Sequence, residues 1–555
     1  MADPTHLDRT PQAPAGRWTD DYAREVAAMD CRRNRSGIVV EPLYAPHGED
    51  APVQLGYPGQ PPFTRGIHAS MYRGRPWSQR LVVGYGLPEH YNARMRMLYE
   101  SGAHGLYLAP CNSHMRGYDA DEVPPELLGT CGTLINTVAD LDIALDGLPY
   151  ASESLSLGDT APFTLSAMLL VLARQRGIAW AGLRGTTNQS DYLSHCAALH
   201  MFFRLSLPGA RRMLLDHVEF MLVNVPHWNA LSVVGQHMQQ AGATPAQAMA
   251  FALSSAIQHA DDLVARGLDP DRFLPRLSFF FDVSISFFEE IAKFRAGRRI
   301  WARVARQRYR ARDPRSMQLR FHTQTAGTDL TRQQPLNNIA RVAVQAMAAI
   351  LGGTQSLHTD AWDEALSAPG EAAARVAIST QNILRDEALL DQVIDPLGGA
   401  YFVERHTDEM EAAIVEVMRD VEQAGGMYAA VGDGYVQRII GEAALAWQNE
   451  LDAGSRQQVG VNCFTADEDA PVAVAAAPRV CDDDVACHLE RLRVWRRNRD
   501  GAALQRALDA LVAAFDNDDN AYARVVDAVA AGATHGEICA CVRRAVGPGV
   551  PVATI

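Results

Sequence analysis

Residues 319–325 read LRFHTQT, a run in which polar side chains alternate with apolar or small ones. Successive side chains of an extended strand point to opposite faces, so Arg320, His322 and Gln324 share one side. Lumens of parallel barrels are normally filled by branched apolar side chains. A lumen lined by His and Gln would instead hold something polar and elongated. The alternative is that these residues are strand ends at the catalytic mouth of an ordinary barrel, and periodicity alone does not choose between the two.

Similar β-like runs alternate with longer helical stretches between about residue 75 and residue 400. The stretch 243–267 carries apolar residues at three- and four-residue spacing, which predicts an amphipathic helix. Strands that alternate with helices predict parallel βα units, and this many units predicts an α/β fold of the (β/α)8 TIM-barrel type. The other runs are GLYLAP (105–110), SLSLG (154–158), ALSVVG (230–235), RLSFFFDVS (276–284) and TQSLHT (354–359).

The segments outside these runs differ in composition. Residues 1–60 are rich in Pro, Gly and charge with little periodicity, which predicts an extended N-terminal arm lying on a neighbouring surface. We expect the barrel to occupy residues 61–462. The VAVAAAP and acidic CDDD segments that follow indicate a linker over 463–483, and the periodic tail predicts a C-terminal helical docking module over 484–555.

Bulk composition excludes several classes of protein. The 555 residues are 48% hydrophobic and 21% charged, and no apolar run reaches the roughly 18 residues that span a bilayer. The polar, Pro-containing N-terminus has no apolar core typical of a secretory signal, so we expect a cytoplasmic protein without a membrane partner. Nine scattered cysteines without a C-x-x-C pair predict neither disulfides nor a metal site.

The charge distribution argues against a nucleic-acid partner. The formal net charge is −14, which is the wrong sign for a phosphate-binding surface. Arg295, Arg298 and Arg299 form either a local basic patch or a solvated helix face, and the second reading is favoured because most charge runs are simply solvated.

Six long segments, in the same order along the chain, resemble the large subunit of the methylmalonyl-CoA mutase family, which includes isobutyryl-CoA, 2-hydroxyisobutyryl-CoA and pivalyl-CoA mutases. The resemblance implies a (β/α)8 barrel whose bore is threaded by the pantetheine arm of coenzyme A. It thereby favours the polar-lumen interpretation of residues 319–325. The segments are TRGIHASMYRGRPW (64–77), GQHMQQAGAT (235–244), PRLSFFFDVS (275–284), FHTQTAGTDLT (321–331), GGTQSLHTDAWDEAL (352–366) and IDPLGGAYFVE (394–404).

The same resemblance implies adenosylcobalamin as the cofactor of a radical carbon-skeleton rearrangement. In the family, cobalamin sits on a flavodoxin-like domain marked by Asp-x-His-x-x-Gly. None of the 17 histidines of this sequence stands in that motif. We therefore expect this chain to carry no cobalamin-binding domain, a separate small cobalamin-binding subunit to supply it, and the two to form a heterotetramer of two large and two small subunits.

Three positions belong to the reacting centre of the family, and this sequence matches two of them and differs at the third. His237, in GQHMQQAG, matches the histidine that hydrogen-bonds the thioester carbonyl, where it can stabilise charge on that oxygen. Gln189 matches the second donor to the same carbonyl, with a one-residue ambiguity toward Asn188. Gln236 stands where the family has a tyrosine beside the adenosyl group and the substrate radical.

The coenzyme A contacts of the family are largely present. Arg75 and Arg276 match arginines that pair with its phosphates, a role that suits a planar cation with several donors. His68 stands where the family usually has tyrosine. The other positions matched along the pantetheine and nucleotide are Ser70, Asn229, Ser278, His322 and Gln355.

The cofactor face is partly changed. Four positions around the corrin and adenosyl groups match the family, and three do not. The matching residues are Gln324, Gly327, Glu364 and Ala365. The replacements are Gln240 for a glutamate, Met115 for a histidine and Cys131 for an alanine.

The acyl end departs most from the family. Val82 replaces the tyrosine and Leu199 the arginine that hold the methylmalonyl carboxylate, so that carboxylate would be buried without partners at a cost of roughly several kcal/mol. Ala109 stands where the 2-hydroxyisobutyryl enzymes have an aspartate for the hydroxyl. These changes predict an apolar, non-carboxylated, branched acyl-CoA as the substrate.

Two other functions stay open from sequence. One is an isobutyryl-CoA/n-butyryl-CoA or 2-hydroxyisobutyryl-CoA mutase large subunit. The other is a non-catalytic paralogue that binds an acyl-CoA and assembles with the small subunit, which the loss of the tyrosine at Gln236 motivates. Retention of His237 and of the coenzyme A contacts favours an enzyme.

Overall fold

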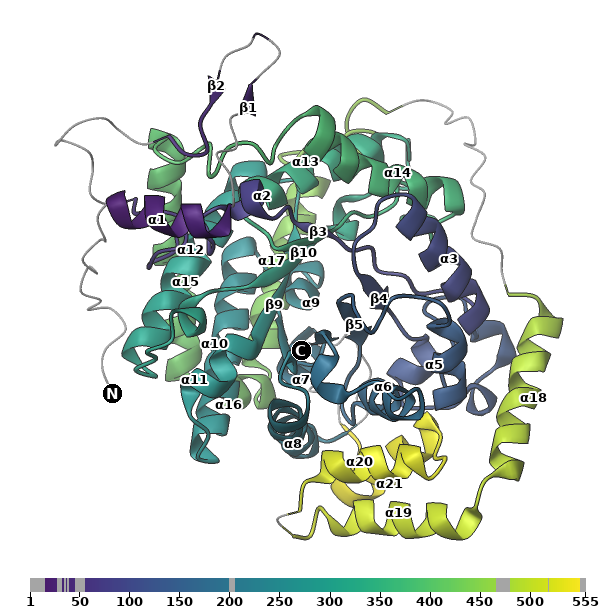
Figure 1. Cartoon of the computed structure of the whole chain (residues 1–555). Helices are drawn as coiled ribbons and strands as arrows, with labels where there is room; N and C mark the ends of the chain where they lie inside the picture. Colours follow the sequence, from purple (N-terminus) through teal and green to yellow (C-terminus); the bar gives the residue numbers. More distant parts are fainter. Residues whose placement is uncertain are drawn as a thin grey trace.

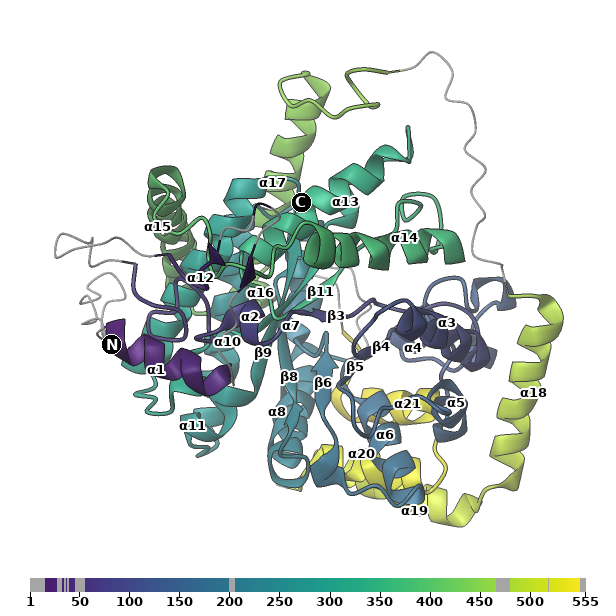
Figure 2. The same cartoon turned by 45° about the horizontal axis from the view of Figure 1, so that its top comes forward.

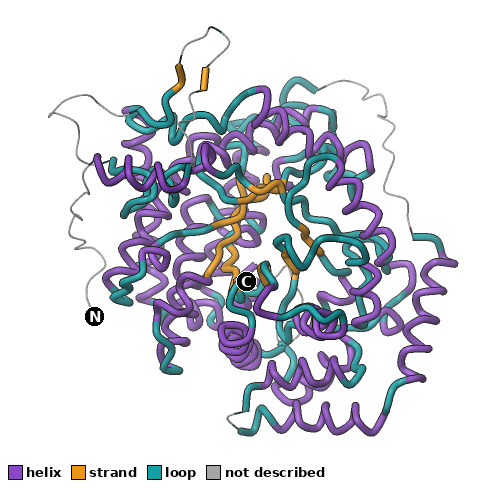
Figure 3. The backbone as a smooth tube through the Cα atoms, in the orientation of Figure 1, coloured by secondary structure: helices purple, strands orange, loops and turns teal. Residues whose placement is uncertain are grey.

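The computed structural model describes residues 15–26, 32–33, 36, 39–44, 55–198, 205–465, 480–517 and 519–549. Most strands lie at the centre with helices around them, and one separate pair, β1 and β2, projects from the edge of the molecule (Figure 3). The strands are β1 (Arg32–Arg33), β2 (Val39–Val40), β3 (Ser78–Gln79), β4 (Leu106–Leu108), β5 (Leu155–Gly158), β6 (Gly185–Asn188), β7 (Trp228–Asn229), β8 (Leu231–Val234), β9 (Leu277–Val283), β10 (Phe321–Thr325) and β11 (Ser356–His358).

The helices follow the strands in alternation, as the sequence predicts (Figure 1). They are α1 (Ala15–Glu25), α2 (Met71–Gly74), α3 (Pro88–Glu100), α4 (Asn112–Met115), α5 (Val138–Ala144), α6 (Thr164–Gln175), α7 (Tyr192–Ala198), α8 (Leu207–Asn224), α9 (Gln236–Gln240), α10 (Pro245–Ala265), α11 (Pro270–Phe273), α12 (Phe287–Gln307), α13 (Asn337–Leu351), α14 (Glu371–Asn382), α15 (Tyr401–Gln423), α16 (Met427–Gly432), α17 (Tyr435–Asp452), α18 (Asp482–Asn498), α19 (Gly501–Ala513), α20 (Ala521–Ala530) and α21 (His535–Val546). No helix in the described part of the chain is both long and apolar enough to cross a bilayer.

The central strands pair in parallel in two sheets, ordered β3-β11-β10-β9-β8 and β4-β5-β6-β7. Two junctions connect the sheets. Val83, beyond β3, pairs with Leu108 of β4, and β7 runs into β8 through Ala230. Counting β7 and β8 as one position, the circuit has eight strand positions, which confirms the predicted (β/α)8 TIM-type architecture.

Side chains close the circuit where β8 passes β6. The backbone N–H of Ser232 donates to the Ser190 hydroxyl at 2.9 Å, and the Ser232 hydroxyl donates to Oδ1 of Asn188 at 3.0 Å. The N–H of Val234 donates to Oδ2 of Asp191 at 3.4 Å. Ser190 and Asp191, which follow β6, therefore satisfy backbone N–H groups of β8 where β6 and β8 form no regular ladder of backbone hydrogen bonds.

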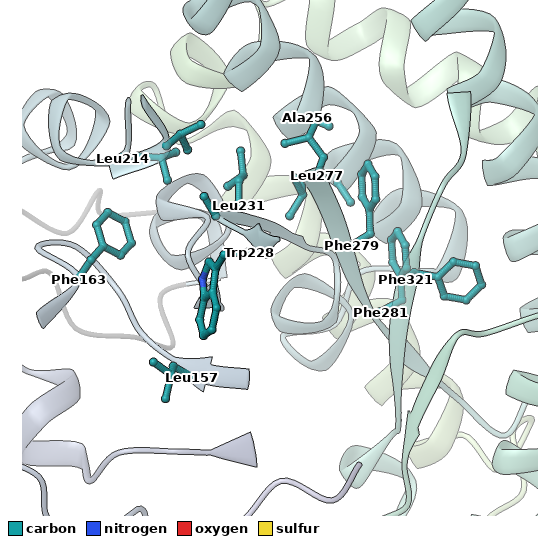
Figure 4. Close-up of a cluster of buried hydrophobic side chains, with 14 of the residues drawn as sticks. Leu157, Phe163, Leu214, Trp228, Leu231, Ala256, Leu277, Phe279, Phe281 and Phe321 are labelled. Atoms are coloured by element: carbon teal, nitrogen blue, oxygen red, sulfur yellow. The ribbon is translucent and has the colours of Figure 1, made fainter. Parts of the chain in front are cut away.

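The outward faces of β9 and β10 form the hydrophobic core. Phe279, Phe281 and Phe321 are buried against the surrounding helices, together with Leu277 and Leu231 (Figure 4). The ring of Phe321 stacks on Phe294 of α12 at 4.7 Å. Their neighbours in sequence point inward, so the period of two separates an apolar outer face from a polar inner one.

The N-terminal arm differs in part from the extended segment that the sequence predicts, because residues 15–25 form helix α1. Trp18 and Tyr22, one turn apart, pack on the core, and the Trp18 indole donates to the carbonyl of Ala69 at 3.1 Å. Glu25 accepts from the backbone N–H of Ser70 at 2.7 Å. The arm is therefore held against the start of α2.

The three arginines at 295, 298 and 299 form neither a basic patch nor a solvated face. Arg295 and Arg298 are 0% and 2% exposed. Arg295 pairs with Asp395 and Glu404, and Arg298 donates to the carbonyls of residues 63, 64 and 352. Both interpretations of this segment were wrong, because α12 presents these side chains to helix α15 and to loops, which carry the partners.

The helices α18–α21 pack on α6 and α8 and on the loops after β4 (Figure 2). Asp119, fully buried, lies at the centre of this contact. Its carboxylate accepts from Arg496 and from the N–H of Gly536, both at 2.8 Å, and from the hydroxyl of Thr534. The division into arm, barrel, linker and docking module stays a prediction, and most of the predicted linker lies outside the described residues.

We predict that Asp119→Ala destabilises the docked helices by about 3 kcal/mol, because it leaves donors from α18 and α21 without their buried acceptor. Asp121→Ala is the matched control. Asp121 also pairs with Arg496, but it is partly exposed, and such a pair contributes at most about 1 kcal/mol. Thermal denaturation and limited proteolysis of both variants measure the difference, and equal losses would contradict this account of the contact.

Candidate active site

A cavity of about 550 Å³ runs along the inside of the barrel. Its walls are mostly hydroxyl, amide and cationic side chains that the inward positions of the strands supply. Side chains on the strands include Ser156, Thr186, Asn229, Ser232, Ser278, His322 and Ser356. This lining supports the polar lumen over the alternative of strand ends at the mouth of an apolar barrel.

Strand register arranges the inner side chains of β9, β10 and β11 in rows. Phe280, His322 and Ser356 pair across the three strands at one level. Two residues toward the carboxyl ends, Asp282, Gln324 and His358 form the next row. A step of two residues along a strand is about 6.6 Å, so the two rows are successive levels of one bore.

The amino-terminal end of the bore is cationic. Arg75, Arg315 and Arg320 line it, and Arg276 lies close enough to affect Arg320 electrostatically. Burial, followed by the charges of Arg276 and Arg315, lowers the pKa of Arg320 to about 10. None of the described residues accepts a hydrogen bond from Nε or Nη2 of Arg320. This end is suited to a polyanion such as the phosphates of a nucleotide.

His68 lies at the same entrance. Burial, opposed by Glu25 and reinforced by Arg320 and Arg75, lowers the pKa of its imidazole. Ser70, in contrast, does not line the cavity, since its hydroxyl and N–H both donate to Glu25 of α1. The helix of the N-terminal arm therefore stands beside the entrance.

The middle of the bore contains neutral polar groups. Nδ1 of His322 lies 2.7 Å from the hydroxyl of Ser356, and burial holds the pKa of His322 well below its usual range. Gln355 accepts from the N–H of Phe321 at 2.8 Å. The buried side chain of Arg80 donates to the hydroxyl of Ser156. An elongated polar chain passing here would meet hydroxyls, an amide and an uncharged imidazole.

His237 lies on α9, directly after β8, and is fully buried. Its ring centroid is 4.9 Å from that of His195, whose Nε2 lies 2.6 Å from the carbonyl of Gln189. Gln189 has a φ of 57°, a strained value for a residue with a side chain. A Cβ on Gly158 would lie 3.5 Å from Oε1 of Gln189. The matched residues His237 and Gln189 are thus linked through His195.

Asn188 and Gln189, the two candidates for the second donor to the carbonyl, lie side by side at the end of β6. Asn188 lines the bore, but its Oδ1 accepts from Ser232 and from the N–H of Gln189, both at 3.0 Å. Gln189 follows the strand and turns away from its regular path. Both lie near the carboxyl end of β6, so either amide is close to the centre that His237 marks.

Carboxyl groups gather at the carboxyl ends of β9 and β11. Asp282 accepts from Gln240 at 3.3 Å, and Asp360 accepts from Gln324 at 3.2 Å and lies 2.9 Å from Nε2 of His358. Burial, and then the neighbouring carboxyl of Asp360, raise the pKa of Asp282 well above its usual range.

Two predicted residues of the acyl end, Val82 and Ala109, lie in the segments that follow strands β3 and β4. The N–H of Val82 donates to Nδ1 of His358 at 3.0 Å. Ala109 follows β4, and its N–H donates to the carbonyl of Val83 at 2.9 Å. Val82 and Ala109 are therefore on neighbouring segments, which pair between Val83 and Leu108. Leu199 lies outside the described residues.

The predicted cofactor face is open at the carboxyl ends of the strands. Cys131, Glu364 and Ala365 are exposed, whereas Met115 is buried. Among the described residues, a Cβ added to Gly327 would have only Oδ2 of Asp360 within 4 Å. Partial desolvation and the carboxyls of Asp360 and Asp363 raise the pKa of Glu364 to about 8. An open face with a glycine and polar side chains is suited to a large flat cofactor.

Several lining residues were not predicted from sequence. Arg80, Arg315 and Arg320 line the cavity. Asp282 pairs in register with Gln324, one level beyond His322, and Asp360 accepts from Gln324. Two of them could have been predicted from the alternation of side chains along a strand. Arg320 is two residues from His322, and Asp282 is four residues from Ser278, so each shares the inward side with that residue.

Most of the chain is similar to known proteins. The family model for methylmalonyl-CoA mutase matches residues 33–548. A 2-hydroxyisobutanoyl-CoA mutase large subunit from Aquincola tertiaricarbonis is 37% identical over 494 residues, 88% of this chain and 87% of that protein. A methylmalonyl-CoA mutase from Rhizobium meliloti is 37% identical over 92% of this chain and 72% of its own length. The mitochondrial methylmalonyl-CoA mutase of Homo sapiens is 36% identical over 92% and 68%.

We predict that Arg320→Gln weakens the binding of coenzyme A by about 10- to 100-fold, because each hydrogen bond to a charged group contributes about 1.5–3 kcal/mol. Arg312→Gln is the control, an exposed arginine of the neighbouring loop outside the cavity. Isothermal titration calorimetry at two salt concentrations measures both. Equal affinities for the two variants would place the phosphates elsewhere.

Proposed function

Because this chain belongs to the methylmalonyl-CoA mutase family, we propose that it is the large subunit of an adenosylcobalamin-dependent mutase that rearranges a branched, non-carboxylated acyl-CoA. The observation that carries the proposal is the polar bore, which runs inward from a cationic entrance, while the buried His237 lies on helix α9 directly after β8. Coenzyme A has this order of groups, with phosphates at one end and a thioester at the other.

The residues of this chain bind and orient the substrate. Arg320 and its neighbours hold the phosphates, and the hydroxyl-lined middle holds the pantetheine, so the thioester arrives at the level of His237. His237 donates to the carbonyl oxygen, and Gln189 lies near as the second donor. The walls of the barrel exclude water from this position, which strengthens the hydrogen bonds and protects a reactive intermediate.

The residues at the open face fit a corrin. Gly327 leaves room beside Asp360, and the exposed Glu364 and Ala365 stand at the same mouth. The chemistry that adenosylcobalamin supplies when bound is removal of a hydrogen atom by a carbon radical. Gln236, Gln240 and Gln324 lie between this face and the bore and would meet the adenosyl side of the cofactor.

A small cobalamin-binding subunit is the proposed partner, in a heterotetramer of two large and two small subunits in the cytoplasm. One relative is named as a large subunit, and the match covers 87% of it, against 68–72% of the methylmalonyl-CoA mutases of Rhizobium meliloti and Homo sapiens. The sequence contains no Asp-x-His-x-x-Gly for a cobalt ligand.

The acyl group is proposed to carry no carboxylate. Val82 stands where methylmalonyl enzymes place a tyrosine, and Ala109 is its neighbour across the strands. Asp282 and Asp360 add a second reason, because carboxyl groups supply no cation that could pair with a carboxylate of the substrate. An apolar, branched alkyl part would pack against Val82 and gain about 0.8 kcal/mol for each buried methylene.

The test is reconstitution of activity. We predict that the chain alone binds isobutyryl-CoA but not adenosylcobalamin, and that it turns over only with a small subunit bearing Asp-x-His-x-x-Gly. In that complex His237→Ala lowers kcat by about two to three orders of magnitude, the usual effect of removing one donor to a developing oxyanion. His227→Ala, at an exposed position, is the control.

Three outcomes would contradict the proposal. The first is stoichiometric adenosylcobalamin binding by the isolated chain in gel filtration. The second is full turnover by His237→Ala. The third is a specificity constant for methylmalonyl-CoA above that for isobutyryl-CoA, which would require an unrecognised cation in the pocket.

A further inference from the structure

Asp191 and His259 form a buried pair behind the end of strand β6. Asp191 comes just after β6, and His259 lies on α10. Nε2 of His259 lies 2.7 Å from Oδ1 of Asp191, and both side chains are 0% exposed. A carboxylate oxygen accepts, so His259 donates from Nε2. Neither residue lines the cavity that the described residues enclose, so the pair stands outside the bore.

The carboxylate of Asp191 connects the ends of two strands. Its Oδ2 accepts from the N–H of Val234, the last residue of β8, at 3.4 Å. Its Oδ1 also accepts from the N–H of Leu193, in the first turn of α7, at 3.0 Å. Because β6 and β8 are not neighbours in a ladder, such side-chain contacts determine how the two strand ends lie relative to each other.

The two proposed donors to the thioester carbonyl stand at these strand ends. Gln189 comes shortly before Asp191, and His237 comes shortly after Val234. Little backbone therefore separates either donor from the carboxylate. A displacement of Asp191 would reach both donors, since neither intervening segment is long enough to absorb it.

A second route connects Asp191 to the same donors through α7. The backbone carbonyl of Asp191 accepts from the Ser194 hydroxyl at 2.9 Å and from the N–H of His195 at 3.5 Å. His195 in turn donates from Nε2 to the carbonyl of Gln189 at 2.6 Å, because a carbonyl oxygen only accepts. Its ring lies 4.9 Å from that of His237, between centroids. The contacts thus form a circuit that begins and ends at Asp191 and includes both donors.

The backbone of Gln189 depends on such support. Its φ of 57° lies in the left-handed region, which residues with a side chain rarely adopt. Its N–H donates to Oδ1 of Asn188 at 3.0 Å, and its carbonyl accepts from His195. Strained conformations persist where the surroundings over-determine them. A loosened α7 would therefore let Gln189 relax and turn its amide away from the carbonyl.

His259 holds the carboxylate from the layer of helices. Helix α10 packs on both α7 and α9, and the ring of His259 meets Tyr192 edge-on at 5.3 Å. A buried carboxylate needs hydrogen bonds to offset its lost hydration, and the imidazole supplies the shortest of those that Asp191 accepts. Without this donor the carboxylate would turn toward other partners, and its bonds to Leu193 and Val234 would change.

We propose that Asp191 and His259 are positioning residues for the thioester carbonyl, which set the separation and the orientation of Gln189 and His237. The inference rests on the proposed function, because it takes the carbonyl as the group that these two donors bind. It deepens that function by assigning the geometry of the donors to a buried pair outside the bore. Two donors serve one oxygen only when both are correctly placed, and a misplacement of about 1 Å can lower a rate by about 100-fold.

The first test measures the carbonyl itself. Isobutyryl-CoA with an isotope label at the thioester carbonyl is bound to the full chain, and difference infrared spectroscopy records its C=O stretch. Two donors polarise the carbonyl, so its stretch is expected at a lower frequency than in the free ligand. His259→Phe keeps an aromatic ring without a donor and is expected to move the band back toward the free frequency. An unmoved band in this variant would overturn the inference.

A rescue variant and a matched control assign the effect to the hydrogen bond. His259→Gln is expected to restore most of the band shift, because a glutamine amide can place an N–H donor near the position of Nε2. His217→Phe is the control, another fully buried imidazole, whose Nε2 lies 3.1 Å from the hydroxyl of Thr187 on β6. Thermal denaturation checks that all variants are folded. Equal band shifts in both Phe variants would indicate a general loss of packing and overturn the inference.

Turnover by the reconstituted complex separates positioning from binding. Asp191→Asn changes the same contact from the other side, since its amide presents N–H groups where a carboxylate oxygen accepts. Both Asp191→Asn and His259→Phe are expected to lower kcat by about 10- to 100-fold and to change the KM for isobutyryl-CoA by less than about threefold. A raised KM with an unchanged kcat would contradict a positioning role.

Two results distinguish a failure of this inference from a failure of the proposed function. If isobutyryl-CoA does not bind, or if its carbonyl band is the same in the wild type, in His237→Ala and in the free ligand, the proposed function fails. If the wild type shifts the band and His237→Ala removes the shift, but His259→Phe and Asp191→Asn both retain it, the inference is wrong and the proposed function stands.

Discussion

The alternation of side chains along β9 and β10 is the constraint on which the rest of the structure depends. Every second residue, such as Phe279, Phe281 and Phe321, is buried against the surrounding helices. Their neighbours are thereby turned into the bore, where Ser278 and His322 line a cavity of about 550 Å³. Because these inner groups are polar, the bore requires a polar occupant, whereas an ordinary barrel fills this space with aliphatic side chains.

One end of the bore offers hydrogen-bond donors and the other end offers acceptors. This difference fixes the direction in which a ligand lies in the bore. None of the described residues accepts a hydrogen bond from Nε or Nη2 of Arg320 at the amino-terminal end. At the carboxyl end, Oδ2 of Asp282 and Oδ2 of Asp360 receive no hydrogen bond from any described residue, and His237 lies on the neighbouring helix α9. Phosphates at the first end and the thioester beside His237 at the second fit a single elongated molecule in one direction. The electrostatic arrangement alone disfavours the reverse direction.

The elements that sequence reasoning found are those with an uninterrupted period. The runs at 276–284 and 319–325 became β9 and β10, and the helix predicted over 243–267 became α10. Strands β3 and β7, of two residues each, are too short to show a period. Helix α1 was missed because its Trp18 and Tyr22 stripe lies among Pro and Gly residues. Burial of Arg298 depends on carbonyls from distant loops, which no local pattern records.

The central claim is that one acyl-CoA lies along the bore from the arginines to His237. A crystal structure of the chain with an unreactive thioether analogue of an acyl-CoA tests it most directly. The account predicts phosphates within hydrogen-bond distance of Arg320, the pantetheine beside His322, and the carbonyl oxygen within hydrogen-bond distance of His237. A coenzyme A arm outside the barrel, or one that runs in the opposite direction, would contradict it.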